Sequence, residues 1–392
     1  MDYSKILSAK SKELKPSGIR KFFDMLGGMD DVVALTVGQP DFVTPWHIRQ
    51  AGIESLEQGK TYYTSNSGLF EMRYEISRYL ERRFGLYYDP KTEIVVTVGG
   101  SEAIDMALRA VIDPGDEVII PTPCFVCYDP LVRMADGVPV TLITEEKDNF
   151  KLTPEKLKAA ITPKTKLLVL PFPNNPTGAI MTRQELEEIA DILRKTDIMV
   201  LSDEIYAEMT YGGKNHVSIA SLPDMKERTI VVNGFSKSYA MTGWRMGYTA
   251  APAAVSEQIL KLHQFAIMCA PTTSQFAAVE ALKNGDGDIE DMVAEYDRRR
   301  RFLVDGLRKI GIPCFEPEGA FYVFPNVGVF GLSSEEFCER LLYEYRVAIV
   351  PGTAFGDCGE GFARISYAYS LKHIAQALER MERFVNALKK EG

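Results

Sequence analysis

The sequence lacks any apolar run long enough to cross a bilayer, and its first residues, 1–5 (MDYSK), are polar and lack the apolar core of a secretory signal. We therefore expect no membrane segment and, by default, a cytoplasmic location. Basic charge is also in deficit, because 45 Lys and Arg face 54 Asp and Glu, a formal net charge of −9. That balance disfavours a nucleic-acid surface. Internal repeats and low-complexity segments are absent as well.

Cysteine is sparse, with six residues scattered along 392. This usage is typical of reduced thiols in a large cytosolic enzyme. Cys124 and Cys127 spell C-x-x-C, but a metal site would need a second such pair. A redox pair would usually open a helix, whereas Pro121 and Pro123 indicate a loop here. We interpret this pair as structural and expect no metal site.

Hydrophobic residues make up 46% of the chain and charged residues 25%, which is ordinary for a globular protein, and the length favours two domains. The middle of the chain alternates apolar strand-like runs with helix-like segments. Because the runs are apolar on both faces, they predict a mostly parallel α/β sheet covered by helices. The predicted strands are 93–98, 117–120, 166–170, 198–202 and 229–232, and the predicted helices are 101–112 and 183–195.

The character of the sequence changes near residue 289, where a long helix is predicted over 289–307. Short strands over 320–324 and 363–367 and a final helix over 371–389 predict a smaller α+β domain. The first of these helices carries the run Arg298–Arg301, which we interpret as a solvated helix face rather than a nucleic-acid contact.

The most informative segment is 233–247 (NGFSKSYAMTGWRMG), which follows the strand predicted over 229–232. Lys237 sits among small and hydroxyl residues at a strand end, where an amine can form an imine with an aldehyde cofactor. Arg245 can grip a phosphate of that cofactor in a forked contact. A second anion site is predicted at 99–101, where Gly99, Gly100 and Ser101 join a strand to a helix.

Asp203 directly follows another predicted strand, in the sequence Ser202-Asp203-Glu204-Ile205-Tyr206. A carboxylate there can hold the nitrogen of a heterocyclic cofactor, and a helix N-cap is the alternative role. Because ligands of parallel sheets bind outside the carboxyl ends of the strands, we expect Asp203 and Lys237 to meet.

Together these motifs resemble the class I/II pyridoxal-phosphate-dependent aminotransferases, with aspartate and aromatic aminotransferases as the nearest type. The resemblance extends from about residue 15 to 388 and includes G-Q-P-D-F, Y-x4-G, P-N-N-P-T-G, D-E-I-Y, the lysine segment and A-R-I-S-Y in family order. It implies the fold-type I architecture. The implied large, cofactor-binding domain spans 47–288, and the implied small domain combines 1–46 with 289–392.

The resemblance also implies roles for individual residues. Lys237 would hold pyridoxal 5′-phosphate and later move a proton at the substrate Cα, and Asp203 would keep the pyridine nitrogen protonated. Tyr206 and Asn175 would contact the ring oxygen O3′. Phe125 would stack on the ring, although core packing is the alternative role for it.

Substrate contacts follow in the same way: Arg364 would clamp the α-carboxylate, and Asn175 would also contact the substrate. Gly38 would lie on a segment that closes over the substrate, unless it belongs to a plain turn. The family often has a serine phosphate ligand three residues before the lysine, where this chain has Gly234. Either Ser236 or Ser238 replaces that hydroxyl, or the contact is absent.

Tyr63, with Tyr62 as its rival, aligns with a tyrosine that reaches the phosphate in the neighbouring subunit. A homodimer with shared active sites is therefore expected. The expected reaction moves the amino group of an L-amino acid, aspartate first and aromatic second, to a 2-oxo acid, with 2-oxoglutarate favoured.

Two other functions stay open at this point. A carbon–sulfur β-lyase uses the same scaffold, but such lyases commonly show D-E-I-H where this chain has D-E-I-Y at 203–206. A cofactor-sensing regulator would need a DNA-binding module before the domain, and only some thirty residues precede 37–40. A dicarboxylate substrate would need a second cation, for which Arg20, Arg109 and Lys261 are candidates.

Overall fold

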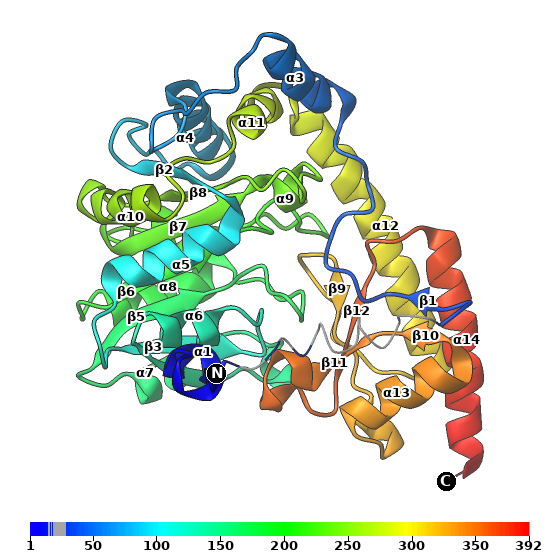
Figure 1. The fold of residues 1–392 in the computed structure, drawn as a ribbon. Helices are drawn as coiled ribbons and strands as arrows, with labels where there is room; N and C mark the ends of the chain where they lie inside the picture. The colour runs from blue at the N-terminus through cyan, green and yellow to red at the C-terminus, as the bar shows by residue number, and fades with distance from the viewer. Residues whose placement is uncertain (15, 17, 19–28, 392) are drawn as a thin grey trace.

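The computed structural model describes residues 1–14, 16, 18 and 29–391, and a seven-stranded sheet forms its centre (Figure 1). Six of its strands point the same way, and only β8 is antiparallel to both of its neighbours, which confirms the predicted mostly parallel sheet. In sheet order the strands are β2 (Ile94–Thr97), β8 (Gly247–Ala250), β7 (Thr229–Gly234), β6 (Met199–Asp203), β5 (Thr165–Leu170), β3 (Glu117–Thr122) and β4 (Val138–Ile143).

Two of these strands are absent from the prediction. β4 lies at the sheet edge with a half-exposed side-chain pattern and carries Pro139, which edge strands tolerate. β8 is only four residues long and begins with Gly247, so its sequence gives a weak strand signal. A Cβ on Gly247 would lie 2.6 Å from the carbonyl carbon of Gly99, so only glycine allows β8 to approach the turn after β2.

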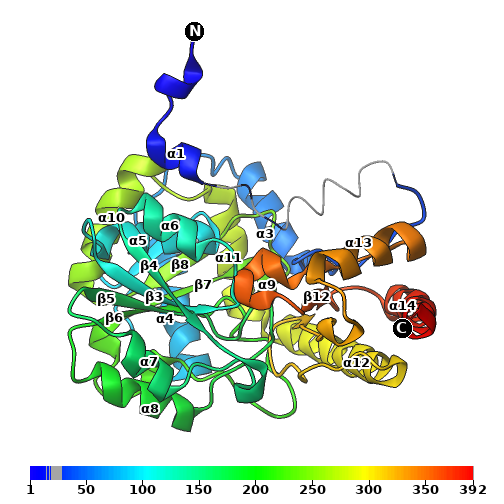
Figure 2. The same ribbon diagram turned by 90° about the horizontal axis from the view of Figure 1, so that it is seen from below.

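Helices cover both faces of the sheet (Figure 2). One face carries α5 (Gly99–Val111), α6 (Tyr128–Met134) and α10 (Ala253–Ala266), and the other carries α7 (Pro154–Ala160) and α8 (Arg183–Leu193). At the β2 end pack α3 (Trp46–Glu57), α4 (Phe70–Phe84) and α11 (Thr272–Asn284). Apart from the edge strand β4, the strands are largely buried on both sides by these layers, which explains their unbroken apolar runs.

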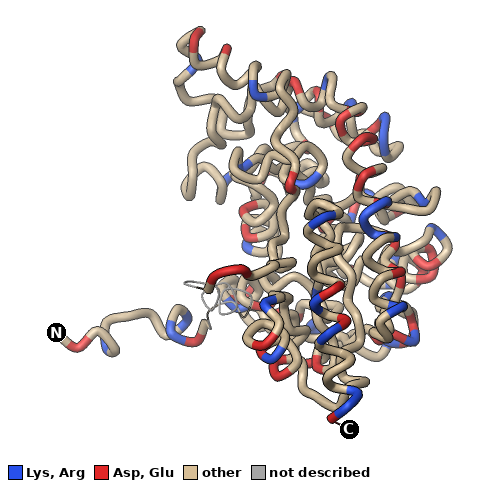
Figure 3. The backbone as a smooth tube through the Cα atoms, turned by 90° about the vertical axis from the view of Figure 1, so that its right-hand side faces the viewer, with Lys and Arg blue, Asp and Glu red and all other residues tan. Residues whose placement is uncertain are grey.

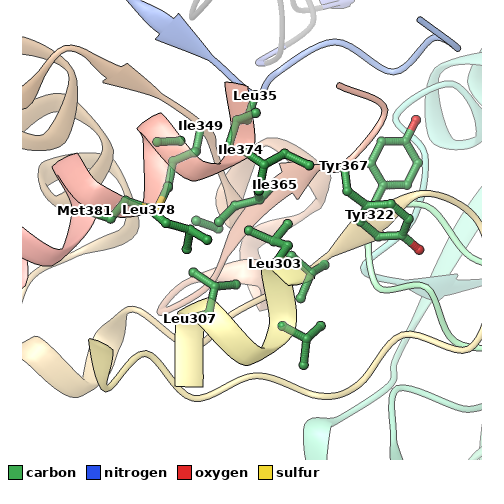
Figure 4. Packing of buried hydrophobic residues seen from close by; sticks show 14 of the residues in the cluster. Leu35, Leu303, Leu307, Tyr322, Ile349, Ile365, Tyr367, Ile374, Leu378 and Met381 are labelled. Atoms are coloured by element: carbon green, nitrogen blue, oxygen red, sulfur yellow. The ribbon is translucent and has the colours of Figure 1, made fainter. Parts of the chain in front are cut away.

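The second group of elements lies beside the sheet and has its own core. The three-stranded antiparallel sheet has the order β11 (Val350–Pro351), β12 (Ala363–Ser366), β9 (Tyr322–Val323), and β1 (Val33–Ala34) pairs with β10 (Val347–Ala348). The helices are α12 (Asp286–Ile310), α13 (Ser334–Tyr345) and α14 (Leu371–Glu391). Figure 4 shows Leu303 and Leu307 of α12 meeting Ile374 and Leu378 of α14 across this core.

The interpretation of the basic run on α12 as a solvated face was wrong for two of its four arginines, since Arg298 and Arg301 are exposed but the two between them are buried. Arg299 and Arg300 are each only 6% exposed. Arg299 pairs with Asp41 at 2.7 Å and lies over the ring of Phe42, and so anchors the 38–42 segment to α12. Figure 3 shows acidic and basic residues interspersed along the helices. Arg300 pairs with Asp297 at 2.8 Å and with Glu316 at 2.9 Å, so it too has partners within the chain.

Short segments complete the described chain. Of these, α1 (Ala9–Glu13) approaches α6 through an ion pair of 2.5 Å between Lys10 and Asp136, and α9 (Phe235–Ser238) follows β7. No helix among the described residues is long and apolar enough to cross a membrane. In the same residues, no group of three or more His, Cys, Asp or Glu could hold a metal ion, and Cys124 and Cys127 are free thiols.

His47 ties three helices together and makes the stability of the fold depend on pH. Its Nδ1 lies 2.7 Å from Glu280 of α11, and its Nε2 lies 2.9 Å from Asp288 of α12. Burial lowers the pKa of His47, but hydrogen bonds to Asp288 and Glu280 outweigh it and leave the pKa raised. The folded value therefore exceeds the unfolded one, so this stabilisation is complete at acidic pH and is lost as pH rises through the folded pKa.

We predict that His47→Gln lowers the melting temperature by about 1–2 °C at pH 6 and by less at pH 9, because the site is partly exposed. Thermal unfolding of both proteins across this pH range measures the difference. An equal loss at both pH values would show that the charge of His47 does not stabilise the helix junction.

Candidate active site

A cavity of about 290 Å³ opens at the carboxyl ends of the parallel strands, between the central sheet and β9 and β12. The ends of β6 and β7 and the loops after β3 and β5 bring their side chains to the same edge. The predicted site residues that line it are Gly38, Gly100, Ser101, Phe125, Asn175, Asp203, Tyr206, Ser236, Lys237, Arg245 and Arg364.

Two predicted residues do not line the cavity. Gly99 lies just behind it, where a Cβ would come 2.7 Å from Nη2 of Arg245. Tyr63 is 78% exposed on the surface of this protomer, and its rival Tyr62 is 58% exposed. Tyr63 is thus not among the described residues that line the cavity of its own protomer.

Lys237 lies on α9 directly after β7, and its Nζ donates a hydrogen bond of 2.5 Å to the carbonyl oxygen of Gly38. The amine also lies 5.6 Å from the ring centroid of Tyr206. Burial, and after it the guanidinium groups of Arg364 and Arg245, lower the pKa of Lys237 to about 8. A lysine with this pKa is available as a neutral nucleophile near neutral pH.

Asp203 ends β6 and is buried. Its Oδ2 accepts a hydrogen bond of 2.7 Å from the hydroxyl of Tyr128, and its Oδ1 accepts one of 3.2 Å from the backbone of Ile205. Burial raises the pKa of Asp203 in spite of these two bonds. A buried carboxylate that faces a cavity is well placed to bind a cationic N–H group there.

Arg364 lies on β12, is 2% exposed and enters the cavity from the side opposite the sheet. Its Nη1 donates to Oδ1 of Asn175 at 3.1 Å, and its Nη2 donates to the carbonyl oxygen of Thr36 at 2.6 Å. Its Nε has no partner among the described residues. The guanidinium thus keeps donor capacity for an anion that enters the cavity.

The anion site predicted at 99–101 and the arginine meet at the other end of the cavity. Gly100 and Ser101 form the first turn of α5, whose N–H groups have no partners within the helix. Arg245 reaches this turn from the loop before β8 and adopts a left-handed backbone with φ of 54°. The guanidinium of Arg245 and the N-terminus of α5 thus place positive charge at the same end of the cavity.

Gly234 has no room for the serine that the family often carries there. A Cβ on Gly234 would lie 2.8 Å from the carbonyl oxygen of Met246 and 3.1 Å from Ile205. Of the two replacement hydroxyls, Ser236 lines the cavity and Ser238 does not.

Sequence reasoning missed two tyrosines in the cavity. Tyr128 begins α6, three residues after Phe125, and that spacing was the available signal. Tyr322 lies on β9, with its hydroxyl 2.8 Å from that of Tyr206. Nothing in the sequence indicates that Tyr322 contacts Tyr206, because 116 residues separate them.

Of the three candidate cations for a second carboxylate, two lie in the described residues and are already paired. Arg109 bonds Asp105 at 2.8 Å within α5, and Lys261 bonds Glu257 at 2.8 Å within α10. Arg20 lies outside the described residues. The cations that line the cavity in the described part of the chain are Lys237, Arg245 and Arg364.

Comparison with known proteins gives a consistent result. Residues 30–381 match the family model for aminotransferase class I and II. A putative aminotransferase of Bacillus subtilis is 53% identical over 97% of this chain and 98% of its own length, and an aspartate aminotransferase of Pyrococcus abyssi is 45% identical over 96% and 97%. The crystal structure of an aromatic aminotransferase from Pyrococcus horikoshii has a TM-score of 0.90 at 45% identity, covering 95% of this chain and 99% of that one.

The lowered pKa of Lys237 can be tested in protein freed of any bound small molecule. We predict that labelling of Lys237 by an amine-reactive reagent reaches half its maximal rate near pH 8, because only the neutral amine reacts. Peptide mass spectrometry after short exposures measures the rate at each lysine.

The variant Arg364→Met should move the Lys237 midpoint upward, because it removes a neighbouring positive charge. Exposed Lys283 of α11 provides the reference lysine within the same digest. A midpoint for Lys237 equal to that of Lys283 would contradict the electrostatics described for the cavity.

Proposed function

Because the chain belongs to the class I and II aminotransferases, we propose that it moves the amino group of an L-amino acid, aspartate first and an aromatic amino acid second, to 2-oxoglutarate. It is a transferase that depends on pyridoxal 5′-phosphate and acts on an amino acid and a 2-oxo acid. The names of an aspartate and an aromatic relative support the two donors. The observation that carries the proposal is the one cavity that holds Lys237, Asp203 and Arg364.

The cavity fits a flat, phosphorylated pyridine aldehyde. A Cβ on Gly100 would have no neighbour closer than 3.7 Å, so this turn leaves space in front of the first N–H groups of α5. Arg245 adds the positive charge that a phosphate requires, and the buried carboxylate of Asp203 matches a protonated ring nitrogen. Lys237 supplies the amine for the aldehyde.

We assign the holding roles as follows. Arg245, Ser101, Ser236 and the turn at Gly99–Gly100 bind the phosphate, Asp203 binds the ring nitrogen, Tyr206 and Asn175 contact the ring oxygen, and Phe125 packs on the ring face. When bound, the cofactor accepts the electron pair of the substrate Cα–H bond and carries the amino group between the two half-reactions.

The remaining chemistry belongs to the chain. Arg364 binds the substrate α-carboxylate through its free N–H groups, while Asn175 fixes the plane of the guanidinium. Lys237, whose pKa is lowered to about 8, would take the proton from the substrate Cα as the neutral amine and would deliver it to the carbon that was the aldehyde of the cofactor. The carbonyl of Gly38 accepts a hydrogen bond from the freed amine and keeps it in the cavity.

The segment that carries Gly38 covers the cavity and excludes water. It is held by Arg299 of α12 through Asp41 and by the hydroxyl of Tyr369, which accepts a hydrogen bond from the backbone N–H of Val37. Both anchors lie outside the central sheet. We propose that residues 47–288 form the large domain and that 1–46 and 289–392 form the small domain and move together.

The distal carboxylate of aspartate or 2-oxoglutarate needs a cation beyond Lys237, Arg245 and Arg364, each of which already has a role. The described residues place no other cation in the cavity lining. We propose that the partner subunit provides it. An aromatic donor has no such requirement, so the relative rates of the two donors report on this cation.

A second copy of the chain completes the site. Large apolar side chains are exposed on α3, at residues 62–63 and at the end of α10, among them Trp46 at 59%, Tyr63 at 78% and Phe265 at 87%. Thr272 donates a hydrogen bond of 2.6 Å to the carbonyl oxygen of Tyr62, so residues 62–63 lie beside the segment after α10. Such a surface is typical of an interface. We propose a two-fold homodimer in which Tyr63 reaches the phosphate site of the partner.

We predict that aspartate, and more slowly an aromatic amino acid, converts the bound cofactor to its amine form without any 2-oxo acid present, and that 2-oxoglutarate restores it. Absorption spectra with a panel of donors measure both half-reactions. Lys237→Ala should slow the first by about 10⁴-fold, because the proton carrier is lost. Lys283→Ala, on exposed α11, is the matched control that should react normally.

Pyruvate, ammonia and homocysteine released from cystathionine without an acceptor would contradict transamination and point to a β-lyase. Donors that leave the spectrum unchanged would refute the proposed reaction altogether.

Shared active sites predict complementation between two defective variants. In a hybrid dimer of Lys237→Ala with Tyr63→Ala, one site carries both defects and the other carries neither. A 1:1 mixture re-associated from monomers should therefore regain roughly a quarter of wild-type activity at limiting cofactor. If Tyr63 served its own subunit, no intact site would form and the mixture would stay near the mean of the two variants.

A further inference from the structure

Tyr322 contacts three of the residues to which roles are assigned above, although it has no assigned role itself. It lies on β9, is fully buried and lines the cavity. Figure 4 shows it at the edge of the core, beside Tyr367. Core packing alone would not require its hydroxyl to reach the cavity.

The hydroxyl of Tyr322 lies 2.8 Å from the hydroxyl of Tyr206, and the two rings meet edge to face at 5.9 Å between centroids. The same hydroxyl faces Gly38, where a Cβ would lie only 2.6 Å away. No side chain larger than glycine fits there without moving Tyr322. The hydroxyl therefore sits between Tyr206 and the covering segment.

The ring of Tyr322 supports Arg364. β9 and β12 pair antiparallel with Ser366 opposite Tyr322, so Arg364 is the diagonal neighbour on the same face. The guanidinium carbon lies 4.5 Å from the ring centroid of Tyr322 and 4.8 Å from that of Phe355. Two aromatic rings thus hold the plane of the guanidinium.

A count of protons sets the direction of the hydrogen bond between the tyrosines. Each phenol has one proton, so if Tyr206 donates to the ring oxygen of the cofactor, it has none left for Tyr322. Tyr322 must then donate to Tyr206, and the two bonds polarise in the same direction. Loss of the Tyr322 hydroxyl would leave Tyr206 a weaker donor.

We infer that Tyr322 is a positioning residue: its hydroxyl orients the proton of Tyr206 toward the cofactor, and its ring orients Arg364 toward the substrate carboxylate. This inference rests on the proposed function, in particular on the role of Tyr206. The side chain of Tyr322 thereby connects Tyr206, which contacts the cofactor, with Arg364, which binds the substrate.

The test is a pH titration of the visible band of the holoenzyme, which follows protonation of the group that joins Lys237 to the cofactor. Tyr206→Phe should raise the midpoint, because a donor to the ring oxygen is lost. Tyr322→Phe should raise it by about 0.5–1 pH unit, the effect of one neutral hydrogen bond. In the Tyr206→Phe background, Tyr322→Phe should add nothing, because its effect passes through Tyr206.

Tyr367→Phe is the matched control. Its hydroxyl is also buried in this core and donates to the carbonyl oxygen of Ala320 at 3.2 Å, but it does not line the cavity. Its midpoint should equal that of the wild type. A shift as large as that of Tyr322→Phe would mean that any buried hydroxyl of this core acts alike and would overturn the inference.

The substrate side of the inference has its own readout. Tyr322→Phe keeps the ring and should change the KM for the amino donor by less than about twofold, whereas Tyr322→Leu should raise it about 3- to 10-fold. An equal KM in both variants would remove the role of the ring.

The outcomes separate this inference from the function on which it rests. An unchanged midpoint in Tyr206→Phe would refute the role of Tyr206 and the hydroxyl relay with it. A shift in Tyr206→Phe but none in Tyr322→Phe, or additive shifts in the double variant, would overturn the relay alone.

Discussion

The structure depends on the confinement of three cations in one small cavity. Lys237 shares about 290 Å³ with Arg364 and Arg245, and burial together with their charges lowers its pKa to about 8. An ordinary surface lysine would be almost wholly protonated near neutral pH and unable to attack an aldehyde. Asp203 is the opposing charge, and its burial leaves it in need of a cationic partner. The cavity can therefore bind one anion at Arg245, a second anion at Arg364, and a cationic group at Asp203.

The fold produces this confinement from two directions. The parallel strands β5, β6 and β7 end at one edge and deliver Asn175, Asp203 and Lys237 there. β9 and β12 approach from the opposite side with Tyr322 and Arg364, and the 37–42 segment bridges the two. Close backbone approaches need glycine at 234, where any side chain would strike Met246. The departure from the family serine at this position is thus a packing requirement.

Sequence patterns predicted the strand ends well, since long apolar runs and their terminal polar residues are local signals. β4 and β8 escaped prediction because one is a half-exposed edge and the other is short. Tyr128 and Tyr322 escaped it because their partners, Asp203 and Tyr206, lie 75 and 116 residues away. Burial of Arg299 likewise depends on Asp41, a contact across 258 residues that no helical pattern reveals.

Borohydride reduction of the holoenzyme tests directly whether Lys237 is the residue that holds the cofactor. Reduction fixes the cofactor permanently to whichever lysine carries it, and peptide mass spectrometry then locates the adduct. We predict one phosphopyridoxyl group per chain, on the peptide that contains Lys237. An adduct on a different lysine, or reduction that leaves no lysine modified, would contradict it.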